Sequence, residues 1–231
     1  MEQCRFIVIS GLIGVGKSRF TKSLADKLGF EPFYEPVDEN PYLELFYKDP
    51  KKYAYPMQEW LKHRRFAAYQ CAAWGIRSGR WNGVVMDRSI HEDSIFANIN
   101  KDLGNIDHLD WDTYLQGFQD FQIFLPEPDV YVFLDAPPEV CCKRTRIRVE
   151  SGDRNEEKCT QVSDTGEEVT GIPLDYMKRL HAGYQSWLAE IAPRIPVVRL
   201  DWTEFKDTDD AWSLVLNQID KRSRFTRSLV V

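Results

Sequence analysis

The fold of this chain is decided by residues 6–18, which read FIVISGLIGVGKS. The apolar run from Phe6 to Ile9 predicts a buried β-strand, and the residues that follow match the pattern G-x-x-x-x-G-K-[ST] at every specified position. Glycines in such a loop let backbone N–H groups turn toward phosphate oxygens, while the lysine adds a positive charge and the hydroxyl a ligand for Mg²⁺. The sequence therefore predicts a phosphate-binding loop formed by Gly11, Leu12, Ile13, Gly14, Val15, Gly16, Lys17 and Ser18.

The residues after the loop support this interpretation over a chance match in a glycine-rich turn. Residues 19–28 place Phe20, Leu24 and Leu28 on one helical face. A helix that begins at the loop directs the positive end of its dipole toward a bound anion. Strand, loop and helix in this order are the context that the motif requires.

Length, composition and charge limit the class of protein. The 231 residues are 43% hydrophobic and contain no Gly/Ser- or Pro-rich linker, which favours a single domain over residues 1–231. The net charge of −6 argues against a nucleic-acid polymer as the main partner. A small polyanion bound together with Mg²⁺ is compatible with this charge.

Cysteine usage and hydropathy indicate an intracellular location. The five cysteines form no C-x-x-C pair and have no histidine at metal-ligand spacing, as expected of reduced thiols. The first strand begins about five residues from Met1, which leaves no room for a targeting peptide. No apolar run approaches the roughly 20 residues that span a bilayer, so we expect a cytoplasmic protein that does not contact a membrane.

Four further apolar runs predict strands at residues 30–34, 83–89, 129–135 and 196–200. They alternate with helical segments, which defines an α/β fold with a five-stranded parallel sheet flanked by helices. Ligands of such sheets bind beyond the carboxyl ends of the strands, so Glu35 should face the same crevice as Lys17. Asp87, at the end of the third strand, is expected to bind Mg²⁺ together with Ser18.

Two helices between the strands carry contrasting patterns. Residues 53–78 read as a helix on which Gln58 and Arg65, seven apart, point the same way. Residues 107–124 read as a helix with an aromatic stripe, which is more often core than a ligand platform.

Arginines are concentrated in the helix that should begin at Pro137 or Pro138. Arg144 and Arg148 share a helical face, where like charges repel unless an anion neutralises them. An exposed charged helix is the alternative, but the nearby phosphate loop favours a lid over residues 144–171 that carries its cations onto the phosphates. The polar residues 158–171 are expected to form a flexible extension of this lid.

Taken together, four motifs resemble the deoxyribonucleoside kinases, in the branch of deoxycytidine, deoxyguanosine and bacterial-type deoxyadenosine kinases. They are the phosphate loop, Glu35-Pro36-Val37, Asp87-Arg88-Ser89, and Arg148 with residues 154–157, and the resemblance covers nearly the whole chain. It implies a P-loop three-layer sandwich with an arginine-bearing lid, a reaction that needs ATP and Mg²⁺, and, by analogy with relatives, a homodimer.

The resemblance implies catalytic roles for five residues. Glu35 would accept the proton of the sugar 5′-hydroxyl, and Arg88 would lie between that carboxylate and the transferring phosphoryl group. Lys17, Arg144 and Arg148 would stabilise the negative charge of the transition state, the main requirement of phosphoryl transfer.

The resemblance also implies which residues bind the two substrates. Tyr47 and Glu157 match the pair that holds the sugar 3′-hydroxyl, while Gln58, Arg65 and Asp93 match the residues that contact the base. Donor ATP would be bound by the phosphate loop, the lid arginines and the loop that covers its adenine, through Arg144, Arg148, Arg154, Glu204 and Phe205.

The base pocket favours a purine deoxynucleoside. A carboxylate such as Asp93 can accept from an exocyclic amino group, which thymine lacks. Residues 35–42 and 92–96 look most like bacterial-type deoxyadenosine kinases. We therefore expect deoxyadenosine as the first substrate, with deoxyguanosine or deoxycytidine next.

The lid departs from the family pattern, because residues 149–153 separate Arg148 from Arg154 where relatives have one residue, and an insertion follows Glu157. Arg146 could replace one of the lid arginines. A nucleoside monophosphate kinase is an alternative function, but residues 36–46 contain no cation for an acceptor phosphate. A non-catalytic nucleotide-binding subunit is a second alternative, although it would have no reason to keep Lys17 and Glu35 together.

Overall fold

The computed structural model describes residues 4–35, 39–151, 160–162 and 168–228, and its side chains are described to residue 218 except in the two short segments 160–162 and 168–170. A parallel five-stranded sheet in the order β2-β3-β1-β4-β7 forms the centre of the molecule. Its strands are β1 (Phe6–Gly11), β2 (Glu31–Phe33), β3 (Val84–Asp87), β4 (Val130–Asp135) and β7 (Val197–Asp201). The predicted α/β class, strand number and strand direction are confirmed.

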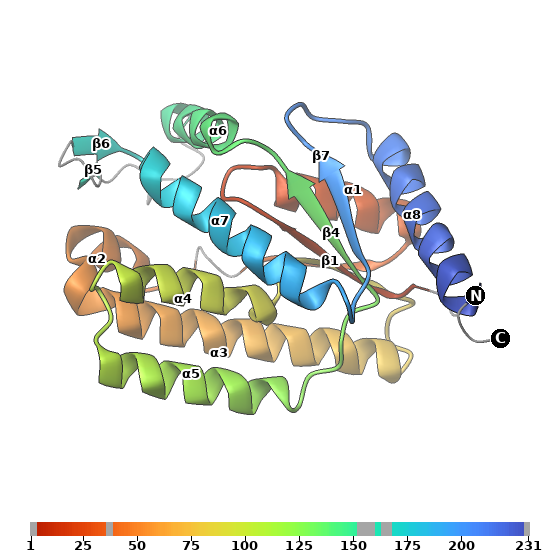
Figure 1. Ribbon diagram of the computed structural model, residues 1–231, viewed down its shortest axis with the longest axis horizontal. Helices are drawn as coiled ribbons and strands as arrows, with labels where there is room; N and C mark the ends of the chain where they lie inside the picture. Colours follow the sequence, from red (N-terminus) through yellow and green to blue (C-terminus); the bar gives the residue numbers. More distant parts are fainter. Residues whose placement is uncertain (1–3, 36–38, 152–159, 163–167, 229–231) are drawn as a thin grey trace.

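Helices cover both faces of this sheet (Figure 1). Helices α1 and α8 pack against each other on one face, and α3, α4 and α7 cover the other, with α5 outside α3. The bounds are α1 (Lys17–Leu28), α2 (Leu43–Lys48), α3 (Pro50–Arg77), α4 (Asp93–Asp102), α5 (His108–Gln122), α6 (Pro138–Ser151), α7 (Leu174–Ile191) and α8 (Thr208–Ser228). A short 3₁₀ helix, η1 (Ile90–Glu92), connects β3 to α4.

The central strands β1 and β4 are buried because they are the most apolar and lie between other strands. Ile7, Val8 and Ile9 are fully buried, as are Val132 and Phe133 in β4. A strand covered by helices on both faces has no solvent-facing side, which explains why these runs are continuously apolar rather than alternating. The sheet therefore holds the carboxyl ends of β1 and β3 rigidly beside each other.

Two short strands form within the stretch that was expected to be a flexible extension of the lid. β5 (Thr160–Val162) pairs with β6 (Glu168–Thr170) in an antiparallel ladder that places Thr160 opposite Thr170. The sequence analysis did not predict these strands because it was based on the polar composition of the stretch. Threonine and valine favour extended backbone even in a polar segment.

Helix ends follow local capping chemistry. The Asp49 side chain accepts a hydrogen bond of 3.2 Å from the N–H of Lys52, and Pro50 occupies the first turn of α3, so the helix begins before the predicted residue 53. Gly29 ends α1 with a φ of 63°, a conformation that suits glycine. No helix within the described residues is long and apolar enough to cross a bilayer.

Candidate active site

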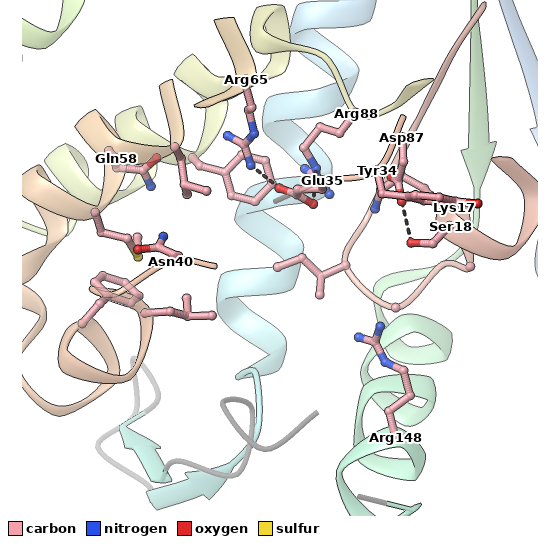
Figure 2. Close-up of a pocket in the computed structure, with 18 of the residues that line it drawn as sticks. Lys17, Ser18, Tyr34, Glu35, Asn40, Gln58, Arg65, Asp87, Arg88 and Arg148 are labelled. Atoms are coloured by element: carbon pink, nitrogen blue, oxygen red, sulfur yellow. Dashed lines mark hydrogen bonds and ion pairs between the residues drawn. The ribbon is translucent and has the colours of Figure 1, made fainter. Parts of the chain in front are cut away.

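A cavity of about 500 Å³ lies beyond the carboxyl ends of β1, β2 and β3. Most of the residues expected to act in catalysis or binding line it, and Figure 2 shows how they converge from separate elements. The predicted residues in its wall are Ile13, Gly14, Gly16, Lys17, Ser18, Glu35, Tyr47, Gln58, Arg65, Asp87, Arg88 and Arg148. The topology of a parallel sheet thus brings together residues that are far apart in the sequence.

The phosphate loop wraps the start of α1 at one end of this cavity. Gly14 and Gly16 have φ values of 81° and 104°, which side chains rarely adopt. A Cβ atom on Gly14 would also lie 2.8 Å from the carbonyl oxygen of Cys141, so glycine is required there on both counts. These positive φ values turn the backbone N–H groups toward the mouth of the loop.

Lys17 reaches across the loop that precedes it. Its ammonium group donates to the carbonyl oxygens of Gly11 at 3.2 Å and Leu12 at 3.0 Å. Burial, together with the neighbouring positive charge of Arg88, lowers the pKa of Lys17 to about 8. A polyanion in the loop would favour the charged form.

Glu35 follows β2 and is held by two arginines. Its carboxylate forms an ion pair with Arg65 from α3 and accepts a hydrogen bond of 3.2 Å from Nε of Arg88. Burial raises the pKa of Glu35, but the charges of Arg88, Arg65 and Lys17 outweigh it and hold the pKa below the usual range of a glutamate. Glu35 is therefore an ionised carboxylate at neutral pH, placed within the same cavity as the loop.

Arg88 adopts a strained backbone conformation, with a φ of 63°. Its N–H donates to the carbonyl oxygen of Ile9 at 3.0 Å, which fixes the residue against the first strand. The guanidinium lies over the ring of Phe96 with its carbon 4.5 Å from the centroid. Such a conformation persists only where the surrounding structure fixes it, and here both the backbone and the guanidinium of Arg88 have defined partners.

Asp87 and Ser18 meet below the loop, where the Ser18 hydroxyl donates to Oδ2 of Asp87 at 2.5 Å. The other oxygen, Oδ1, is buried and has no hydrogen-bond partner among the described residues. Burial raises the pKa of Asp87. A buried carboxylate oxygen without a partner, beside a hydroxyl, is a donor set that fits Mg²⁺.

At the end of the cavity away from the phosphate loop, α3 presents Gln58, while Arg65 of the same helix lies beside Glu35 (Figure 2). Gln58 is buried, and its Oε1 atom has no hydrogen-bond partner in the described part of the chain. Met57, Leu61 and Phe96 supply apolar surface around it. An apolar slot with one unused amide suits a flat heterocycle with polar edges.

Asp93, which the resemblance matches to a residue that contacts the base, lies behind the wall of the cavity. It is fully buried and does not line the cavity, because its carboxylate forms an ion pair with Arg65 and accepts a hydrogen bond of 2.5 Å from the Tyr114 hydroxyl. Its contact with a base would therefore be indirect, through Arg65.

The two lid arginines on one face of α6 have separate environments. Arg148 lines the cavity below the phosphate loop (Figure 2). Arg144 instead donates to the carbonyl oxygens of Val15 at 3.2 Å and Thr203 at 2.9 Å and lies over the ring of Phe205. The two arginines therefore have different partners in this structure, and their role as lid cations stays a prediction.

Phe205 lies where the adenine-covering loop was expected. It is 52% exposed, and a Cβ atom on Gly16 would approach its ring to 2.7 Å, so the ring sits directly on the phosphate loop. Glu204 beside it is exposed. The two remaining predicted site residues, Arg154 and Glu157, lie outside the described residues.

Nine residues of the cavity wall were not predicted as site residues: Arg19, Tyr34, Asn40, Leu43, Phe46, Met57, Leu61, Phe96 and Tyr176. Tyr34 was assigned to a strand and Phe96 to a helix, with no indication of which way each side chain points. Tyr176 stands three residues after Pro173, and only that helix start could have drawn attention to it.

The comparisons with known proteins agree with this geometry. The family model described as deoxynucleoside kinase matches residues 7–223. The chain therefore belongs to the deoxynucleoside kinase family and is an enzyme that phosphorylates deoxynucleosides. This match decides against both the nucleoside monophosphate kinase and the non-catalytic subunit.

Individual relatives carry related activities. The chain is 35% identical to the deoxyadenosine kinase of Dictyostelium discoideum, over 90% of this chain and 77% of that protein. It is 32% identical to the deoxyadenosine/deoxycytidine kinase of Bacillus subtilis, over 92% of this chain and 90% of that protein. The structure of deoxyadenosine kinase from M. mycoides with the products dCMP and a flexible dCDP superposes with a TM-score of 0.72 at 27% identity, covering 93% of this chain and 98% of that one.

Proposed function

We propose that this enzyme transfers the γ-phosphate of ATP to the 5′-hydroxyl of a purine deoxynucleoside, with deoxyadenosine as first substrate and deoxyguanosine or deoxycytidine next. One observation carries the proposal: a single cavity has the phosphate loop and the Glu35 carboxylate at one end and, at the other, the Oε1 atom of Gln58, which has no hydrogen-bond partner among the described residues. A nucleoside that fills it would direct its primary alcohol toward the loop.

In the proposed mechanism Glu35 accepts the proton of the 5′-hydroxyl as that oxygen attacks the phosphoryl group. A carboxylate whose pKa lies below its usual range is a weak base, so proton transfer is expected late, when the attacking oxygen has become acidic. Lys17, Arg88 and Arg148 place positive charge around the position where negative charge develops.

The proposed cofactor is Mg²⁺, held by Asp87 and the hydroxyl of Ser18. The unpartnered Oδ1 of Asp87 supports this assignment. When bound, the ion would neutralise charge on the donor phosphates. Asp87→Asn should raise the Mg²⁺ concentration needed for half-maximal turnover about tenfold or more, and an unchanged requirement would remove Asp87 from this role.

The donor adenine is proposed to lie on the outer side of the phosphate loop, beside Arg144 and Phe205. The guanidinium carbon of Arg144 lies 4.2 Å from the ring centroid of Phe205, and Arg19 approaches the same ring at 5.6 Å. A half-exposed aromatic ring among cations offers a surface for stacking a base. Glu204 belongs to the same loop.

The purine preference is supported by the amide of Gln58 and by the relatives. An amide can pair with adenine through one donor and one acceptor, a geometry also used in nucleic-acid recognition. Arg65, fixed between Asp93 and Glu35, offers donors only. The relatives include both a deoxyadenosine kinase and a deoxyguanosine kinase.

The assay that tests the proposal supplies the four common deoxynucleosides separately with ATP and Mg²⁺ and separates the products by chromatography. The highest kcat/KM is expected for deoxyadenosine and the lowest for thymidine. Preferred phosphorylation of thymidine would contradict the base assignment.

A homodimer in the cytoplasm completes the proposal. The outer surface of α3 and α5 exposes Trp74 by 68% and, just beyond α5, Phe124 by 69%, and both line one groove. Exposed aromatic groups of this size are typical of association surfaces. Light scattering should give a molecular mass twice that of the 27.0 kDa chain. The Trp74→Glu variant should give a lower mass, closer to that of one chain.

A further inference from the structure

Behind the cavity, a buried carboxylate is connected to the catalytic arginine through one tyrosine. Glu92, the last residue of η1, is fully buried. It accepts hydrogen bonds from the Ser10 hydroxyl at 2.8 Å, the Ser89 N–H at 3.0 Å and the Tyr184 hydroxyl at 2.8 Å. Neither Glu92 nor Tyr184 lines the cavity.

Tyr184 from α7 joins Glu92 to Arg88. Its hydroxyl donates to Oε2 of Glu92 and accepts a hydrogen bond of 2.5 Å from Nη1 of Arg88. A phenol has a single hydrogen, so donating it to Glu92 leaves the oxygen lone pairs for the guanidinium. Burial raises the pKa of Tyr184 well above its ordinary value, so the phenol stays protonated and this direction is maintained.

Each end of the Arg88 guanidinium then has a fixed partner. Nε donates to Glu35 at 3.2 Å, Nη2 to the carbonyl oxygen of Gly11 at 3.3 Å and Nη1 to Tyr184. The Tyr184 contact is the shortest of these and comes from helix α7, whereas Glu35 and Gly11 lie at the ends of strands. Without it, Nη1 would be a buried donor with no acceptor, and the strained backbone at Arg88 would lose a constraint.

We propose that Tyr184 and Glu92 are positioning residues that orient Arg88 toward the transferring phosphoryl group. The inference rests on the proposed function, which assigns Arg88 to that group. The alternative is a structural role, since Glu92 closes a capping box with Ser89 and Tyr184 packs against Phe96 and Phe133.

Tyr184→Phe separates the two roles, because it removes the hydroxyl and keeps the ring contacts. We expect kcat to fall about tenfold, while KM for ATP and for deoxyadenosine changes little and the variant stays folded at the assay temperature. The matched control is Tyr69→Phe, another fully buried tyrosine, whose hydroxyl donates to the Pro126 carbonyl oxygen at 2.7 Å, away from the cavity. Its kcat should stay within about twofold of the wild type.

A double-mutant cycle with Arg88→Lys tests whether Tyr184 acts through the guanidinium. Lysine has no Nη1 atom, so adding Tyr184→Phe to Arg88→Lys should change the single-turnover rate by less than about twofold. Equal fold-losses in both backgrounds would overturn the proposal, as would an unchanged kcat in folded Tyr184→Phe.

Glu92→Gln is the second variant, and it serves if Tyr184→Phe does not fold. The amide can donate to the tyrosine oxygen and so compete with Arg88, and a loss in kcat without a change in KM is again expected. Normal kcat in this variant would overturn the proposal that Tyr184 and Glu92 orient Arg88. The activity of the wild type distinguishes failure of the proposed function from failure of the positioning role. A wild type that phosphorylates no deoxynucleoside would overturn both proposals. An active wild type with unaffected variants would overturn only the positioning role of Tyr184 and Glu92.

Discussion

The carboxylate of Glu35 accepts a hydrogen bond of 3.2 Å from Nε of Arg88, so the residue proposed as general base directly contacts the cation proposed to stabilise the phosphoryl group. The contact joins the end of β2 to the end of β3, whose strands are neighbours in the sheet. Proton acceptance and charge stabilisation therefore depend on one hydrogen-bonded pair, and both are expected to respond when either residue changes.

The first prediction concerns Glu35 itself. Glu35→Gln keeps the shape of the side chain but removes the proton acceptor, so kcat should fall about 100-fold or more. ATP binding, measured by calorimetry, should persist. The control is Glu39→Gln, because Glu39 is an exposed carboxylate that pairs with Arg64 outside the cavity. Near-normal turnover in Glu35→Gln would exclude Glu35 as the base.

The second prediction is a loss of activity at alkaline pH. The lowered pKa of Lys17, about 8, means that the free enzyme loses this positive charge as pH rises through that value. kcat/KM for ATP should therefore decline above about pH 8, whereas kcat should hold to higher pH because bound phosphates favour the charged amine. A kcat/KM that stays constant to pH 9.5 would contradict the assigned environment of Lys17.

The third prediction separates base recognition from ATP binding. Gln58→Ala leaves the slot without its amide, so kcat/KM for deoxyadenosine should fall about 10- to 100-fold with KM for ATP unchanged. Gln70→Ala is the control, since Gln70 lies on the same helix α3 but lines the groove with Trp74 instead. Equal losses for all deoxynucleosides and for ATP would argue against a base-binding role.

The fourth prediction concerns the ring on the phosphate loop. Phe205→Ala removes the surface that Arg144 covers, and KM for ATP should rise about tenfold while KM for deoxyadenosine is unaffected. The exposed Phe124, which is remote from the loop, provides the control as Phe124→Ala. An unchanged KM for ATP would show that the donor adenine does not stack there.

Much of the fold and part of the site could be predicted from the sequence, because the signals were local or followed from sheet geometry. The loop motif, the apolar strands and the position of Glu35 beyond β2 each depend on a few consecutive residues. Once the strands are parallel, their carboxyl ends share one edge, which brings Glu35, Lys17 and Asp87 into one cavity. The hairpin of β5 and β6 was missed because its pairing depends on contacts that polar composition does not show.

The sequence by itself therefore determined the phosphate loop, the α/β class and the convergence of the strand-end residues. Only the tertiary structure decided that Asp93 lies behind Arg65, that Arg144 and Arg148 have different partners, and that Tyr184 connects Arg88 to Glu92. Tyr184 stands 96 residues from Arg88 and 92 from Glu92. Periodicity shows which face of a helix is buried, but the side chain that it meets depends on how distant helices pack against each other, and this is fixed only when the whole core forms.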